Sequence, residues 1–132
     1  MKTYLLITAF LISISIKAQQ ESKDTIYFKY DNKYIKTYVE IPKHLYIKDA
    51  SGTSSGNFYF TKIRNINGPK SKAKVICLKK FIRSSIFYNK SKLPKLNDYN
   101  LYEELNKFVI IFVKKTNGSK EYILVESSFE IE

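Results

Sequence analysis

Residue types that could carry out chemistry are few and scattered in this 132-residue sequence. The chain has one histidine, His44, and one cysteine, Cys77. Nucleophilic catalysis of the Ser-His-Asp or Cys-His type needs such side chains beside positioned partners, and a zinc site needs several of them. No phosphate-binding or calcium-binding loop motif occurs in the sequence. We therefore expect no cofactor, no metal ion and no enzymatic activity.

Simpler explanations than catalysis exist for both single residues. His44 follows Pro42 and Lys43, which indicates an exposed surface turn. Cys77 lies in the apolar stretch 75–78, which predicts a buried structural thiol. An alternative that stays open is a small hydrolase of the cell envelope or a hydrolase inhibitor, since two facing carboxylates can perform hydrolysis. Several carboxylates are available for such a pair: Asp31, Glu40, Asp49, Asp98 and Glu104.

Two groups of residues are candidates for a binding surface. Aromatic residues make up 15% of the chain, without tryptophan, and tyrosine interleaved with lysine could stack on sugar rings or bases or anchor a protein. The first group is Tyr27, Tyr34, Lys36 and Tyr38. The second group is a basic cluster that includes Tyr88: Lys79, Lys80, Arg83, Lys90, Lys92 and Lys95. Cross-strand aromatic pairing and a solvated basic loop are the structural alternatives.

The formal net charge of +11 favours anionic partners. A basic protein attracts lipid headgroups, acidic polysaccharides and nucleic acids over a long range. Arginine, the residue suited to bidentate phosphate or carboxylate recognition, occurs only at Arg64 and Arg83. We therefore expect an anionic polymer or a protein as partner and disfavour nucleic acid. The composition of an A/T-rich genome is an alternative source of the lysines.

The first residues have the pattern of a secretory leader. Lys2 is followed by an apolar run over 4–16 and by the small residue Ala18. This run fits the roughly 7–15 residues of a signal peptide and is shorter than the roughly 20 of a spanning helix. We expect cleavage after Ala18, an uncleaved anchor being the alternative. Residues 19–132 then form a single domain in the periplasm, on the cell surface or in the medium, with no transmembrane segment.

Most of the mature chain has the patterns of β-strands. Period-two alternation predicts a hairpin of 26–30 and 35–41 around Asp31-Asn32, with Phe28 opposite Ile35. In that hairpin the first group of tyrosines lies on the polar face. Residues 49–57 have the Gly/Ser composition of a loop. Further strands are expected over 45–48, 58–64, 72–78 and 108–115, and the segment 79–95 stays undecided between helix and extended chain.

Two local signals are stronger. Asn117-Gly118 predicts a two-residue hairpin, whose register places Lys114 opposite Glu121. The same register pairs Phe112 with Ile123, Ile110 with Val125 and Ile111 with Leu124. Asn97 or Asp98 caps a helix near 98–107, in which Leu101, Leu105 and Phe108 share one face and Glu103 pairs with Lys107.

The predicted fold is mainly β with some helix (α+β). It consists of an antiparallel sheet, or a small sandwich or barrel, of about six to seven strands with one short helix near 98–107.

Three segments together resemble a group of small exported hypothetical proteins of Gram-negative bacteria. The resemblance rests on 24–44 (DTIYFKYDNKYIKTYVEIPKH), 77–89 (CLKKFIRSSIFYN) and 96–113 (LNDYNLYEELNKFVIIFV). It implies export and a single domain, but no assigned activity and no functional residue. The sequence thus favours an exported, non-enzymatic binding or interaction module of the cell envelope, with an anionic, glycan or protein partner.

Overall fold

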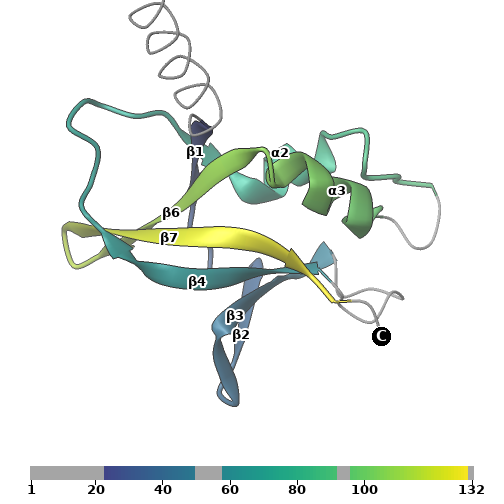
Figure 1. Cartoon of the computed structure of the whole chain (residues 1–132), viewed down its shortest axis with the longest axis horizontal. Coiled ribbons are helices and arrows are strands. Elements are labelled where there is room, and N and C mark those ends of the chain that lie inside the picture. Colours follow the sequence, from purple (N-terminus) through teal and green to yellow (C-terminus); the bar gives the residue numbers. More distant parts are fainter. Residues whose placement is uncertain (1–22, 50–57, 92–95, 131–132) are drawn as a thin grey trace, which may run out of the picture.

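One curled sheet, a half-barrel with parallel and antiparallel pairs, organises the molecule (Figure 1). The computed structural model describes residues 23–49, 58–91 and 96–130. Among these residues the strand order is β2-β3-β4-β7-β6-β1-β5. The strands are β1 (Asp24–Lys29), β2 (Ile35–Tyr38), β3 (Ile41–Ile47), β4 (Phe58–Ile66), β5 (Val75–Cys77), β6 (Phe108–Thr116) and β7 (Ser119–Phe129). The expected mainly β fold with some helix is confirmed.

The hairpin at Asn117-Gly118 is confirmed in its register. Lys114 lies opposite Glu121, and the three apolar pairs between β6 and β7 are as predicted. Asn117 and Gly118 have φ angles of 45° and 81°, the positive values that a type I′ turn requires at both central positions. Turn chemistry and apolar pattern agree here, so neighbouring residues alone determine the pairing.

The predicted hairpin of 26–30 with 35–41 is wrong. β1 lies between β6 and β5 and runs parallel to both, so Phe28 is opposite Phe112 and Ile76. The segment after β1 forms a helical turn instead of a hairpin turn, since the amides of Tyr34 and Ile35 donate to the Asp31 carbonyl. This turn directs the chain away from β1.

β2 pairs with β3, and Ile35 lies opposite Ile47. The chain turns at Val39 and Glu40, so the expected strand 35–41 is interrupted. Val39 is 97% exposed at this turn. The β2–β3 hairpin extends away from the helices and the rest of the sheet, as Figure 1 shows.

Among the described residues, two helices accompany the sheet where one was predicted. The helix α3 (Asp98–Leu105) is confirmed, and the Asn97 side chain accepts a hydrogen bond from the Asn100 amide at its start. Lys107, however, pairs with Glu104 at 2.8 Å and not with Glu103. The second helix, α2 (Leu78–Arg83), follows β5 directly and lies in the segment that the sequence left undecided.

The core fills the space between the inner face of the sheet and the two helices. Phe112 on β6 is fully buried and its ring lies 5.0 Å from that of Phe60 and 6.4 Å from that of Phe28. Leu78 and Ile82 of α2 and Leu101 and Leu105 of α3 belong to the same cluster. Cys77 is half-buried at the end of β5 and lies outside this core, in contrast to the expected buried thiol.

Several predictions of the sequence lie outside the described residues. These are the leader and its cleavage site, most of the Gly/Ser loop, and Lys92 and Lys95 of the basic cluster. Within the described ranges no helix is long and apolar enough to cross a lipid bilayer.

Candidate functional site

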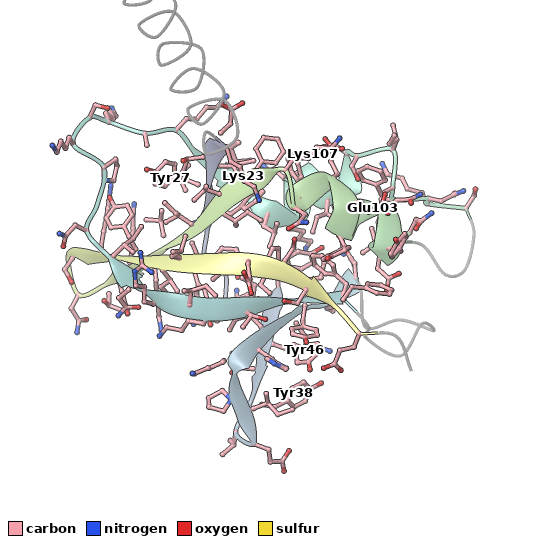
Figure 2. The ribbon with its side chains drawn as sticks, viewed as in Figure 1. Lys23, Tyr27, Tyr38, Tyr46, Glu103 and Lys107 are labelled. Atoms are coloured by element: carbon pink, nitrogen blue, oxygen red, sulfur yellow. The ribbon has the colours of Figure 1, made fainter. Side chains whose placement is uncertain are left out.

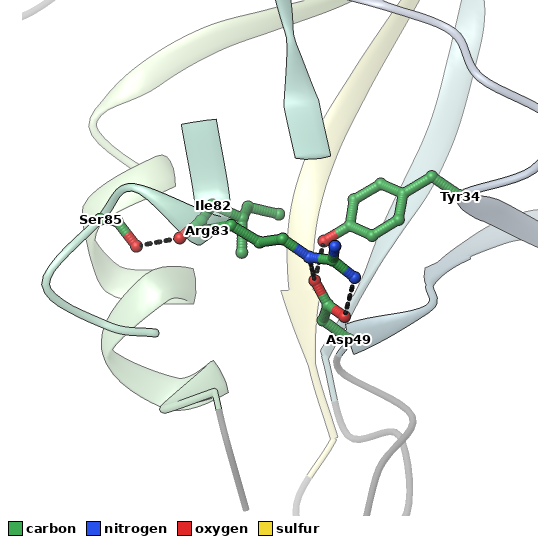
Figure 3. A network of polar contacts seen from close by, with 5 residues as sticks. All are labelled: Tyr34, Asp49, Ile82, Arg83 and Ser85. Atoms are coloured by element: carbon green, nitrogen blue, oxygen red, sulfur yellow. Dashed lines mark hydrogen bonds and ion pairs between the residues drawn. The ribbon is translucent and has the colours of Figure 1, made fainter. Parts of the chain in front are cut away.

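Tyr34 belongs to a partly buried polar network that joins three parts of the chain (Figure 3). Its ring is only 2% exposed, and its hydroxyl donates a hydrogen bond of 2.7 Å to Oδ2 of Asp49. Arg83 at the end of α2 donates to both Asp49 oxygens, from Nε at 3.0 Å and from Nη2 at 3.1 Å. The Arg83 guanidinium also lies 5.9 Å from the centroid of the Tyr88 ring. These contacts fasten α2 to the chain segments that flank β2 and β3.

The proposed polar face of Tyr27, Tyr34, Lys36 and Tyr38 is therefore not one surface. Tyr34 precedes β2 and points into the protein. Tyr27 is half-buried on β1, and its ring meets that of Tyr122 at 6.5 Å. Figure 2 shows Tyr27 of β1 far from Tyr38 and Tyr46 on the β2–β3 hairpin. Only Lys36 and Tyr38 remain together, as exposed residues of β2.

The network also determines how Asp49 titrates. Burial acts to raise the pKa of this carboxyl, but the hydrogen bonds from Arg83 and Tyr34 outweigh it, so that the pKa lies below its ordinary value. The pKa of Tyr34 is raised by burial and by its hydrogen bond to Asp49, so the hydroxyl keeps its proton. Both shifts favour the charged carboxylate and the neutral phenol that the network needs.

We expect this network to make stability depend on acid pH. Since the pKa of Asp49 is lower in the folded state, its contribution is fully present above the unfolded value of about 3.9 and is lost as the pH falls through the folded pKa. Urea unfolding gives the free energies of unfolding of the wild type and of Asp49→Asn from neutral to acid pH. The difference between these two free energies should shrink as the pH falls below about 4. Asp24→Asn, at the exposed start of β1, is the matched control. A gap that stays constant with pH contradicts the assignment.

A second feature is a hollow at the carboxyl ends of three parallel strands. β5, β1 and β6 run in the same direction, so the end of β1, the end of β5 and the second half of β6 meet at one edge of the sheet. The hollow has a volume of about 460 Å³. The basic residues that line this hollow are Lys29, Lys114, Lys115 and Lys120. The Lys114 ammonium lies 5.2 Å from the centroid of the Tyr30 ring, which also lines the hollow.

Two further hollows adjoin the first. One, of about 450 Å³, is lined by Lys79, Lys80, Arg83 and Lys90 and shares Cys77 with the first hollow. The other, of about 280 Å³, shares Val75 and Lys120 with it. None of the residues described as lining the three hollows is acidic. We call the following nine residues the lysine surface: Lys29, Lys70, Lys72, Lys79, Lys80, Lys90, Lys114, Lys115 and Lys120.

The lysine surface combines predicted and unpredicted residues. The sequence identified Lys79, Lys80 and Lys90, which lie close together in the chain. Arg83 lines the same hollow, but its guanidinium is engaged by Asp49. Lys29 was missed because β1 reaches Lys114 and Lys115 only through its long-range parallel pairing with β6, whereas Lys120 lies opposite Lys115 in the local β6–β7 hairpin. No short sequence signal reports such parallel pairing.

A third feature is a group of rings on the face of the sheet opposite the core. His44 and Tyr46 alternate along β3 with the buried Leu45 and Ile47, and Tyr59 on β4 lies beside them. The His44 ring stacks on that of Tyr59, with 4.2 Å between centroids and 28° between planes. Tyr46 lies 5.4 Å from Tyr59 and 5.2 Å from Tyr38. We call the following four residues the aromatic face: Tyr38, His44, Tyr46 and Tyr59.

Sequence reasoning found one member of the aromatic face, Tyr38, and its neighbour Lys36, which lies opposite Tyr46. His44 is half-buried against two tyrosines rather than exposed in a turn, and its Nδ1 lies 3.3 Å from the Tyr46 hydroxyl. The alternation of His44 and Tyr46 with Leu45 and Ile47 was the signal that could have placed these rings on one face. The described residues hold no cluster of three or more His, Cys, Asp or Glu side chains suited to a metal ion.

Comparisons of this chain with protein-family models, with curated proteins and with solved structures found no match. The function is therefore argued from the geometry of the lysine surface and the aromatic face.

Proposed function

We propose that this protein is an exported, non-enzymatic binding module of the cell envelope that holds an anionic polymer on its lysine surface. The observation that carries the proposal is the lining of three adjoining hollows, in which nine lysines meet and no carboxylate is present among the described lining residues. Like charges gathered in this way repel one another, and a bound polyanion relieves that repulsion.

The type of residue also supports a polymer over a small anion. A lysine ammonium acts as a point charge, whereas bidentate recognition of one phosphate or carboxylate uses arginine. The ion pairs Arg83–Asp49 and Lys107–Glu104 involve no member of the lysine surface. Three adjoining hollows suit an extended chain of charges. The leader-like residues 1–18 support the exported location, in the periplasm, on the cell surface or in the medium.

We expect the triple variant Lys29→Ala, Lys115→Ala and Lys120→Ala to bind polygalacturonate at least about tenfold more weakly than the wild type near 0.15 M salt. These residues line the first hollow. The salt slope of the logarithmic binding constant should fall by about 2, because each lost contact to a flexible polyanion removes roughly 0.7. Titration calorimetry on residues 19–132 over a salt series measures both quantities.

The control replaces three lysines that line none of the three hollows: Lys33→Ala, Lys43→Ala and Lys62→Ala. Net charge changes equally in the two triple variants. If both variants lose the same affinity, attraction is a property of total charge and the lysine surface is not a site. If the wild type does not bind polygalacturonate at low salt, the polyanion proposal fails.

A further inference from the structure

The aromatic face has the geometry of a stacking platform. Its rings come from three neighbouring strands, β2, β3 and β4, and each lies between 4.2 and 6.1 Å from another ring of the group. Tyr59 is 8% exposed and forms the base, whereas Tyr38 is 49% exposed at the open side. Figure 2 shows Tyr38 and Tyr46 on the same side of the hairpin. Mutual packing holds the rings in place before any ligand arrives.

Polar groups border the platform along β4 and β7. The Tyr59 hydroxyl donates to Oε1 of Glu130 at 3.1 Å, and the Thr61 and Ser128 hydroxyls lie 2.7 Å apart. Glu126 is the cross-strand neighbour of Thr61. Burial and the charge of Glu130 together raise the pKa of Tyr46, which places this carboxylate in electrostatic reach of a second ring.

We propose that the aromatic face binds an uncharged glycan chain, with sugar rings stacked on Tyr38, His44 and Tyr46. Tyrosine offers a flat apolar face with a polar tip, which matches a sugar ring with its C–H face and outer hydroxyls. Carboxylates accept hydrogen bonds from such hydroxyls. The same carboxylates repel phosphates on the β4–β7 side, which disfavours a nucleic acid strand there, whose bases could otherwise stack on the rings. Lys36 is the basic neighbour on the β2 side, opposite Tyr46. This site differs from the lysine surface in its residues and in the charge of its ligand.

The single histidine provides a direct probe, since His44 lies within the platform and gives the only imidazole signals in an NMR spectrum of the chain. We expect cellohexaose, chitohexaose or maltohexaose to shift these signals in a saturable way. Tyr38→Ala and Tyr46→Ala should each weaken that binding about tenfold. Changing salt from about 0.05 to about 0.5 M should alter it less than about twofold, since no net ligand charge is involved.

The matched control is Tyr99→Ala. Tyr99 on α3 is 46% exposed, and its ring packs against those of Tyr102 on the same helix and Phe129 on β7, away from the aromatic face. The Tyr99→Ala variant should bind the hexasaccharides with the affinity of the wild type. Because Tyr38 is exposed, the Tyr38→Ala variant should keep the fold, and its NMR spectrum verifies this. The proposal is overturned if none of the three sugars shifts the His44 signals, if Tyr99→Ala weakens binding as much as Tyr38→Ala, or if single-stranded DNA shifts the signals instead. None of these outcomes bears on binding of polygalacturonate to the lysine surface.

Discussion

Phe112→Ala is expected to lower the free energy of unfolding by about 3–5 kcal/mol. Phe112 is 0% exposed on β6, which pairs with β7 on one side and with β1 on the other. Its ring contacts those of Phe28, Tyr30 and Phe60. Removing it deletes the ring about which the others pack and leaves a cavity that strands paired on both sides cannot close.

Equilibrium unfolding in urea, followed by circular dichroism, measures this loss. Phe108→Ala is the matched control, because Phe108 begins the same strand but is only half-buried at the margin of the core. Phe108→Ala should lower the free energy of unfolding by less than half as much as Phe112→Ala, because Phe108 removes a smaller apolar area from water on folding. Equal losses for the two variants would contradict the placement of Phe112 at the centre of the core.

The sequence was sufficient at two places where the structure depends on neighbouring residues. At Asn117-Gly118 the turn type and the apolar alternation specify one register, and at Asn97 the cap and the spacing of Leu101 and Leu105 specify one helix. In both cases the interacting residues lie within 15 positions of one another, so the pattern contains the answer.

The sequence was insufficient where partners are distant. The alternation of β1 fits any strand with a matching apolar face, and its partners, β6 and β5, lie far along the chain. The short spacing to β2 favoured a hairpin, as it would in most β proteins. This error also hid part of the candidate site, because the parallel arrangement of β5, β1 and β6 brings Lys29, Lys114 and Cys77 to one hollow.

Tyr34 shows a different limit. Residues 34, 36 and 38 share a face only if the strand includes all three, and β2 begins at Ile35. Tyr34 instead closes the helical turn that starts at Asp31, which rotates its side chain inward. Its partners Asp49 and Arg83 are 15 and 49 positions away, and nothing local indicates the contact. Tyr34, one of the four residues of the predicted polar face, thus lies inside the protein and donates to Asp49.

Tyr34→Ala is expected to cost about 3–5 kcal/mol of stability, as truncation of a buried aromatic ring does. Tyr34→Phe retains the ring and removes only the hydroxyl that donates to Asp49. It should cost about 1.5–3 kcal/mol, the range for a hydrogen bond to a charged group. Urea unfolding at neutral pH measures both values, and their difference separates packing from hydrogen bonding. A Tyr34→Phe variant as stable as the wild type would contradict the network.

The same pair of variants distinguishes a structural tyrosine from a binding one. Tyr34→Phe should leave the affinity for polygalacturonate and for the hexasaccharides unchanged at temperatures where it is folded, since its ring is only 2% exposed. Arg83→Ala should cost a different amount of stability in the wild type and in Tyr34→Phe, because both side chains act through Asp49 and groups that share a partner are not additive. Equal costs of Arg83→Ala in the two backgrounds would mean that the hydroxyl and the guanidinium act independently. A loss of ligand affinity in folded Tyr34→Phe would return Tyr34 to the binding surface and require a rearrangement that exposes its ring.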